Sequence, residues 1–84
     1  MLEPKLSSNA AKYIQSLDKG MRKRISDKII ELAKDPQNIR LSKPLKNSVK
    51  RGARVGSYRI LFQIIGGVLL VSDVGPRGQI YREA

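Results

Sequence analysis

The first part of the chain repeats apolar residues at the spacing of an α-helix. Ser7-Ser8-Asn9 offers N-cap side chains, and the apolar positions after it are three or four residues apart: Ala10, Ile14 and Leu17. A second helix is predicted from about Lys19 to Lys34, with an apolar stripe of Met21, Ile25, Ile29 and Leu32. Asp35-Pro36 ends it, because the residue before a proline disfavours the helical conformation. The pattern therefore predicts two helices joined by a tight link.

The apolar period changes to two in the second half of the chain. A strand is predicted over 58–65, with one set of residues facing the helices (Tyr58, Ile60, Phe62 and Ile64) and Arg59 and Gln63 facing the other way. Gly66-Gly67 suits a two-residue hairpin turn, and residues 68–74 form the returning apolar strand. Further strands are expected within residues 1–6 and at about 49–55, whereas residues 37–48 are expected to be irregular.

These elements add up to a single α+β domain that spans residues 1–84. We expect a short N-terminal strand and a two-helix hairpin packed on one face of a mainly antiparallel sheet of three to four strands. A chain this short buries only roughly 60% of the surface that its unfolded form exposes, which allows one modest core. An active site is therefore expected on an open face of the domain.

The composition excludes several kinds of chemistry. The chain has no cysteine and no histidine, so disulfides, thiolate nucleophiles, the commonest general base and the commonest zinc ligands are excluded. Catalysis would depend on Lys, Arg, Tyr, Asp or Glu, and no metal or cofactor is implied. The N-terminus lacks the apolar stretch of a signal peptide, and the longest apolar run, 60–71, is too short to span a bilayer. We expect a cytoplasmic protein with no membrane partner.

Positive charge is concentrated in the second half. The chain has 17 basic and 7 acidic residues, a net charge of +10. Residues 1–36 hold eight basic and five acidic residues, and residues 37–84 hold nine basic and two acidic ones. Such a field costs self-repulsion unless a polyanion or an acidic protein neutralises it. The alternative is a highly solvated surface with no partner.

Three segments resemble the RelE/ParE toxin superfamily. Residues 54–63, RVGSYRILFQ, resemble its "R-x-G-x-Y-R-h-h-Y/F-x" strand pair, and residues 74–81, VGPRGQIY, resemble its "h-G-x-R-x-x-h-Y" signature. Asp35-Pro36 followed by Lys43-Pro44-Leu45-Lys46 resembles its "D-P … K-x-L" connection. The order of elements also agrees, and the resemblance covers essentially the whole chain. It implies a RelE-like fold.

The resemblance also implies functional residues. In the RelE branch, which cleaves messenger RNA in the ribosomal decoding site, matching positions act at the scissile phosphate; here these are Arg59, Arg77, Tyr81 and a basic cluster of Lys50, Arg51 and Arg54. Lys46, Arg51 and Arg54 are assigned to flanking phosphates or ribosomal RNA. Gly52 departs from the pattern, because relatives usually carry a basic residue there. Lys50 or Arg51 could substitute for that basic residue. A shift of one position along a strand, however, turns the side chain to the opposite face of the sheet.

RNA can be cleaved without metal or histidine if its own 2′-hydroxyl attacks the adjacent phosphate. Arginines hold the phosphate, whereas a lysine among arginines can act as base, because nearby positive charge disfavours its protonated form. Lys50 is the candidate base, Arg59 and Arg77 the phosphate ligands, and Tyr81 stacks on a nucleobase or donates a proton. Each has a plainer alternative. Arg59 could be a solvated strand residue, Arg77 could lie at the exposed tip of a turn, and Tyr81 could be a packing residue. The cluster with Lys50 could bind phosphate without catalysis.

Three functions remain open from the sequence. The first is a ribosome-dependent, metal-independent endoribonuclease that inhibits translation, favoured by the ending Gly75-x-Arg77-x-x-x-Tyr81. The second is a ParE-like gyrase inhibitor without nuclease activity. The third is an inactive RNA-binding relative, supported by Gly52. All three imply an acidic cognate antitoxin bound in a heteromeric toxin–antitoxin complex, and the first adds mRNA and the ribosome with its rRNA as partners.

Overall fold

Both helices begin at a polar side chain that caps them. In the computed structural model, which describes residues 1–38, 41–45 and 49–76, helix α1 spans Ser8–Gln15 and α2 spans Lys19–Lys34. The Ser7 hydroxyl accepts a hydrogen bond from the Ala10 amide at 3.1 Å, and the Asp18 carboxylate accepts one from the Met21 amide at 2.8 Å. These bonds satisfy amides that have no partner within the helix, which explains where each helix starts.

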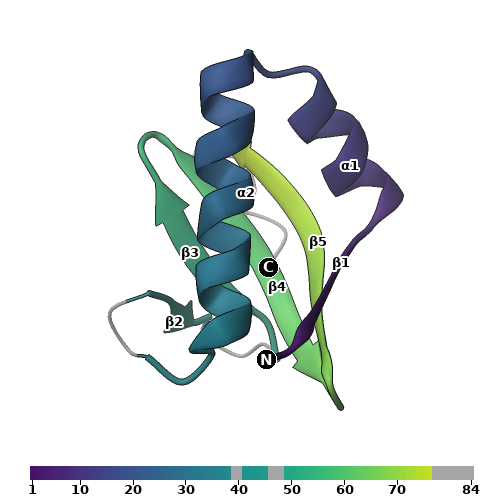
Figure 1. Cartoon of the computed structure of the whole chain (residues 1–84), viewed down its shortest axis with the longest axis vertical. Helices are drawn as coiled ribbons and strands as arrows, with labels where there is room; N and C mark the ends of the chain where they lie inside the picture. The colour runs from purple at the N-terminus through teal and green to yellow at the C-terminus, as the bar shows by residue number, and fades with distance from the viewer. Residues whose placement is uncertain (39–40, 46–48, 77–84) are drawn as a thin grey trace.

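Five strands form one mixed sheet. They are β1 (Glu3–Leu6), β2 (Lys43–Pro44), β3 (Arg51–Val55), β4 (Tyr58–Ile65) and β5 (Val68–Pro76), in the spatial order β1-β5-β4-β3-β2. β1 pairs with β5 in parallel, and the other neighbours are antiparallel. Figure 1 shows α2 lying across the front of the sheet with α1 beside it. The α+β class and the order of elements are therefore confirmed.

The sheet has one strand more than the sequence predicted. β2 is only two residues long and pairs with Arg51 and Gly52 at the edge of the sheet, within the segment expected to be irregular. A strand this short shows no alternation of apolar and polar residues that a sequence pattern could reveal. Pro44 fits there because an edge strand leaves one row of backbone groups outside the ladder.

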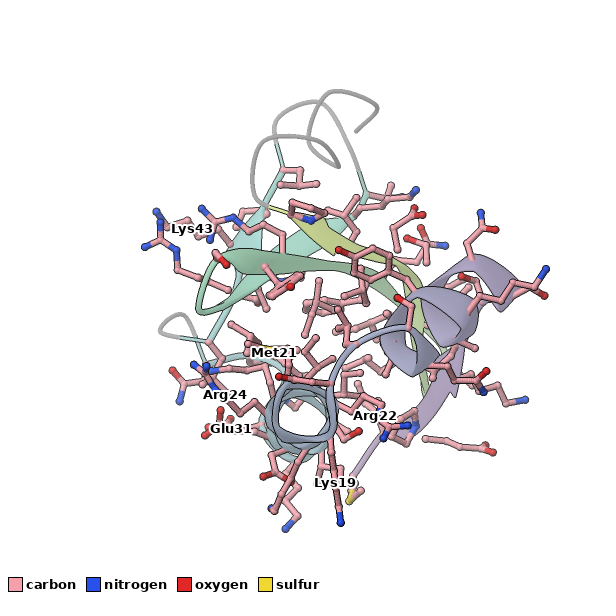
Figure 2. The ribbon with its side chains drawn as sticks, turned by 90° about the horizontal axis from the view of Figure 1, so that it is seen from above. Lys19, Met21, Arg22, Arg24, Glu31 and Lys43 are labelled. Carbon is pink, nitrogen blue, oxygen red and sulfur yellow. The ribbon has the colours of Figure 1, made fainter. Side chains whose placement is uncertain are left out.

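The core lies between the helices and one face of the sheet. Ile60 and Phe62 on β4 are fully buried, as predicted, and they pack with Ile25 and Leu32 of α2. Figure 2, which looks along α2, shows Met21 directed toward the sheet and Lys19 directed away from it. Ile64 shares the strand face of Phe62 yet is 40% exposed, so the buried part of this face ends before the end of β4.

An irregularity in β5 keeps the alternation of apolar residues in step with the core. Phe62 pairs with Val71 and Leu61 with Asp73, so Ser72 is an extra residue on β5. This β-bulge allows Val71 and Val74, three positions apart, to be buried in the same core. The bulge is fixed by two bonds: the Ser7 hydroxyl donates to the Ser72 carbonyl at 2.6 Å, and the Ser7 amide donates to the Val71 carbonyl at 2.9 Å.

Candidate nucleic-acid interface

The sheet has a second face, directed away from α1 and α2, which we call the outer face. Cross-strand partners lie on the same face of a sheet, so the strand pairing shows which residues belong to the outer face. One row consists of Arg54, Arg59 and Gly75, and the next of Gly52, Leu61 and Asp73. Leu61 is buried but lies outside the core cluster, in agreement with its place on the outer face.

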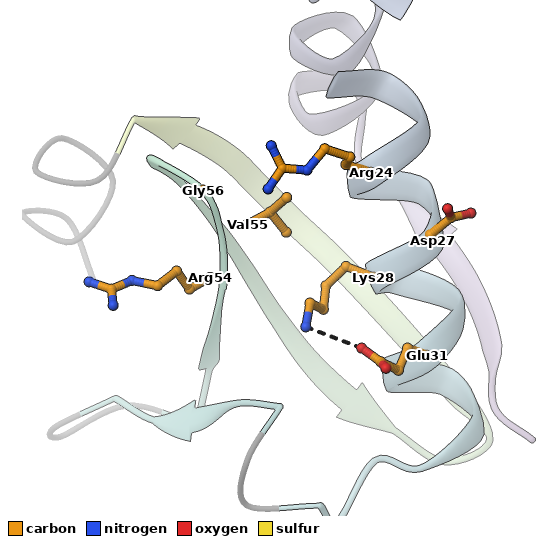
Figure 3. Close-up of a pocket in the computed structure, with 7 residues that line it drawn as sticks. All are labelled: Arg24, Asp27, Lys28, Glu31, Arg54, Val55 and Gly56. Atoms are coloured by element: carbon orange, nitrogen blue, oxygen red, sulfur yellow. Dashed lines mark ion pairs between the residues drawn. The ribbon is translucent and has the colours of Figure 1, made fainter. Parts of the chain in front are cut away.

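Two arginines stand directly opposite each other on this face. Arg54 of β3 pairs with Arg59 of β4; Arg54 is exposed and Arg59 half-buried. Figure 3 shows Arg54 directed away from α2. Like charges directly opposite each other on adjacent strands destabilise a sheet. The pair therefore costs stability in the isolated protein and fits a surface that receives an anion.

Lys50 extends this cationic group beyond the first residue of β3. Its carbonyl accepts a hydrogen bond from the Leu45 amide at 3.0 Å, which continues the β2–β3 ladder by one step. The alternation of strand side chains then places Lys50, two positions before Gly52 and four before Arg54, on the outer face. The structure thus brings Lys50, Arg54 and Arg59 to one face, and the outward direction of Arg59 agrees with the sequence prediction.

Arg51 lies elsewhere. It pairs with Phe62, so it belongs to the core side of the sheet, where it is half-buried. Its Nε donates to the Ser42 hydroxyl at 2.9 Å, and its guanidinium also donates to the Ser42 carbonyl at 3.4 Å. Arg51 therefore holds the segment before β2, and the structure does not bring it to the cationic group of the outer face, because a single step along a strand reverses the side chain.

Three of the predicted site residues lie outside the described residues: Lys46, Arg77 and Tyr81. Their assignments remain those of the sequence. Arg77 follows Pro76 in the sequence, and Pro76 ends β5 opposite Tyr58. The residue next to Tyr58 is Arg59, so β5 ends beside the arginine pair.

A shallow hollow of about 370 Å³ separates α2 from β3. Its lining includes Arg24 and Lys28 of α2 (Figure 3). The Lys28 ammonium is paired with Glu31 at 3.1 Å. The Arg24 guanidinium lies over Gly56, where an added Cβ would be 3.5 Å from it. Gly56 has a φ of +58°, a conformation that L side chains rarely adopt, so glycine suits this turn.

An aromatic pair joins α1 to the start of β4. The rings of Tyr13 and Tyr58 are 6.2 Å apart between centroids and meet edge to face at 61°. Burial raises the pKa of the Tyr13 phenol above its ordinary value, and the neighbouring Tyr58 raises it further. Both residues are half-buried, which agrees with a structural role for Tyr58.

Comparison with known proteins identifies the family of the chain and relatives that share its fold. The model of a family described as the ParE toxin of the type II toxin–antitoxin system, parDE, matches residues 5–81. The chain therefore belongs to this toxin family, within the RelE/ParE superfamily. It is the toxin of a toxin–antitoxin pair. The search of curated proteins gave no match.

Solved structures of RelE toxins share the fold. The toxin–antitoxin complex RelBE2 of Mycobacterium tuberculosis matches with a TM-score of 0.79 at 21% identity, over 90% of this chain and 98% of that chain. The isolated E. coli RelE toxin matches with a TM-score of 0.79 at 21% identity, over 99% of this chain and 94% of that one. The RelB–RelE complex of Methanococcus jannaschii matches with a TM-score of 0.73 at 26% identity, over 99% of this chain and 98% of that chain.

No helix in the described part of the chain is long and apolar enough to cross a membrane.

Proposed function

We propose that this toxin is a metal-independent endoribonuclease that cleaves messenger RNA in the ribosomal A site and thereby inhibits translation. The observation that carries the proposal is the arginine pair, Arg54 opposite Arg59, on the outer face of a chain with a net charge of +10. Opposed guanidiniums are unfavourable alone and favourable around a phosphate, which each can bind through two parallel hydrogen bonds.

The reaction uses the RNA as its own nucleophile. The 2′-hydroxyl loses a proton and attacks the adjacent phosphorus in line, and the bond to the 5′-oxygen of the next nucleotide breaks as that oxygen gains a proton. Arg59 and Arg77 hold the phosphate as negative charge builds up in the transition state. Lys50 is a proton-transfer group, and Tyr81 orients the RNA by stacking, a contact worth about 1–3 kcal/mol per base. Arg54 and Lys46 bind the flanking phosphates.

Alignment of the RNA decides how fast this reaction runs. Well-oriented reacting groups reach effective molarities of roughly 10⁵–10⁸ M. The hollow between α2 and β3 is shallow, and the arginine pair stands on the face of a sheet. The ribosome, which holds mRNA in a fixed conformation, supplies the alignment in this proposal. Cleavage of free RNA is therefore expected to be slow.

The antitoxin of this proposal is an acidic segment with apolar residues. The outer face is cationic at Arg54 and Arg59 and apolar near the β4–β5 turn, where Ile65 pairs with Val68 and Gln63 with Leu70. Ile65 is 54% exposed. A segment that covers both parts would neutralise the arginines and bury the apolar side chains. Solved relatives of this fold include RelE toxins bound to RelB antitoxins.

The family match favours a second candidate function. The matching model is named for the ParE toxin, and the ParE branch inhibits DNA gyrase without cleaving RNA. In that case the outer face would bind a protein and the arginines would contact acidic side chains. A third candidate is an RNA-binding relative without activity, because Gly52, buried on the outer face, carries no side chain to transfer a proton.

Induced expression in a bacterial host distinguishes the three candidates. Wild type and Arg77→Ala are compared by growth and by primer extension on several translated messages, with Lys34→Ala on α2 as the control for loss of a surface charge. In-frame cuts by wild type and Lys34→Ala alone support the nuclease. Intact messages with arrested growth and broken DNA support gyrase inhibition. Intact messages with normal growth support the inactive binder.

A further inference from the structure

The bulge at Ser72 determines which face of the sheet Asp73 occupies. Val71 faces the core, so regular alternation would return Asp73, two positions later, to the core side. The extra residue shifts the alternation by one, and Asp73 instead pairs with Leu61 on the outer face. Bulges commonly re-aim a side chain next to a functional site. The Ser7 bonds to Val71 and Ser72 hold this bulge in place.

Asp73 is a carboxylate in a cationic setting. It is the only acidic residue in the sequence of strands β2 to β5. The residue is half-buried, and in the part of the chain that the structure describes its carboxylate is in no hydrogen bond or ion pair. Arg59 is its diagonal neighbour on β4, since Arg59 and Leu61 are two positions apart on the same face.

Three kinds of functional group follow one another across three adjacent strands. β5 carries the Asp73 carboxylate, β4 the Arg59 guanidinium, and the β3 side contributes Lys50. On β4, Asp73 stands opposite Leu61, and Arg59 lies two positions before Leu61. Lys50 is level with Gln63, two positions after Leu61, because Arg51 pairs with Phe62. The three groups therefore surround Leu61 on the outer face. An in-line displacement needs three such groups around the phosphorus: a proton acceptor, a phosphate ligand, and a proton donor on the side opposite the acceptor.

We infer that Asp73 is a further catalytic residue of the RNA cleavage proposed above, on which this inference rests, and that it takes the proton of the 2′-hydroxyl. The 2′-oxygen then bonds to phosphorus, and the bond from phosphorus to the 5′-oxygen breaks. The protonated Lys50 amine gives its proton to that oxygen. The products are a 2′,3′-cyclic phosphate, a 5′-hydroxyl, a protonated Asp73 and a neutral Lys50, and solvent returns both groups to their starting state.

This assignment changes the role that the sequence gave to Lys50. As a base, an amine must first lose its proton, whereas a carboxylate is already ionised at neutral pH. The other charged groups nearest Asp73 on the outer face are cationic: Arg59 and Arg54 on one side and Lys5 of β1, opposite Leu70, on the other. This arrangement of charges suits a carboxylate as the proton acceptor and an ammonium as the donor.

The test is the pH dependence of cleavage by the full-length toxin on ribosomes carrying a defined mRNA. A carboxylate base with an ammonium donor gives a rate that is flat between about pH 6 and pH 9, whereas an amine base gives a rate that rises about tenfold per pH unit. Asp73→Asn is expected to slow cleavage by about 10²–10⁴-fold, and Asp73→Glu to restore part of it. Asp27→Asn on α2, a carboxylate paired with Lys23, is the matched control.

Urea unfolding and RNA binding of Asp73→Asn show that the variant is folded and still binds. Cleavage by Asp73→Asn at the wild-type rate, or a wild-type rate that rises steadily with pH, would overturn the inference while leaving the proposed nuclease intact. A wild-type toxin that leaves ribosome-bound mRNA uncut would instead remove the proposed function itself, so the two failures are distinguishable.

Discussion

The two faces of the central sheet are built from the same three strands and differ in almost every property. On the core side, Ile60 and Phe62 are fully buried against the helices. On the outer side are two opposed arginines and Asp73, whose carboxylate has no hydrogen bond or ion pair with the described residues. Packing on the core side stabilises the folded state, whereas the arginine pair destabilises it.

The difference indicates what each face is for. Burial of apolar surface contributes about 25 cal/mol per Å² and accounts for the core side without any further role. The opposed arginines have no such explanation, because like charges across a strand pair are unfavourable. Their cost is compensated when the outer face binds an anion. Substitutions on the core side should therefore lower stability, whereas substitutions on the outer side should lower activity.

The largest effect on stability is expected at Phe62. The ring is fully buried at the centre of the core, so Phe62→Ala leaves a cavity and lowers the free energy of unfolding by about 3–5 kcal/mol. Urea denaturation followed by circular dichroism measures the change. A loss below about 1 kcal/mol would show that the helices do not pack on this face as described.

A smaller effect on stability is expected at Ser7, which holds the bulge in β5. Ser7→Ala removes the cap of α1 and the 2.6 Å bond to the Ser72 carbonyl, and is expected to cost about 1–2 kcal/mol. Ser8→Ala, one position later and exposed, is the control. In a ribosome cleavage assay at equal folded fraction, Ser7→Ala should also be slower if the bulge aims Asp73; an unchanged rate would separate the bulge from catalysis.

Arg54→Ala should have a small effect of the opposite sign. Arg54 is exposed and stands opposite Arg59, so its removal is expected to raise the free energy of unfolding by about 0.2–1 kcal/mol. The same variant should bind RNA more weakly, and the slope of log K against log salt should decrease in magnitude by about 1. Reduced stability together with an unchanged salt slope would argue against a phosphate contact.

The smallest effect concerns alkaline pH. Burial raises the pKa of Tyr13 in the folded state above that of the unfolded chain, so the folded form holds this proton more tightly. The associated stability is present below about pH 10 and is lost as the pH rises through the folded-state pKa. Tyr13→Phe should show a shallower loss of stability in this range, measured by thermal unfolding. Parallel pH curves for the two proteins would contradict the assignment.

Much of this fold follows from local sequence, because its main elements are long enough to show a period. The limits of α2 at Lys19 and Lys34 and of β4 at Tyr58 and Ile65 coincide with the changes of pattern that predicted them. β2 escaped prediction because two residues have no period. The outward face of Arg59 followed from strand alternation, and its pairing with Arg54 agrees with that prediction.

The outer-face position of Asp73 could not be predicted, because it depends on tertiary structure. The bulge at Ser72 is stabilised by Ser7, which is 65 positions away in the chain. No local pattern in 68–76 indicates where alternation shifts. The position of Arg24 over Gly56 depends on tertiary structure too, since it joins α2 to the β3–β4 turn. Residues whose roles depend on such distant contacts need a structure.

In this proposal the outer face performs the chemistry while the core face maintains the fold. The most direct test is Arg59→Gln, measured for mRNA cleavage on ribosomes and for urea unfolding with the same preparation. We expect cleavage to be slower by about 10²–10³-fold, with a free energy of unfolding within about 1 kcal/mol of wild type. Wild-type cleavage by a folded Arg59→Gln protein would contradict the claim.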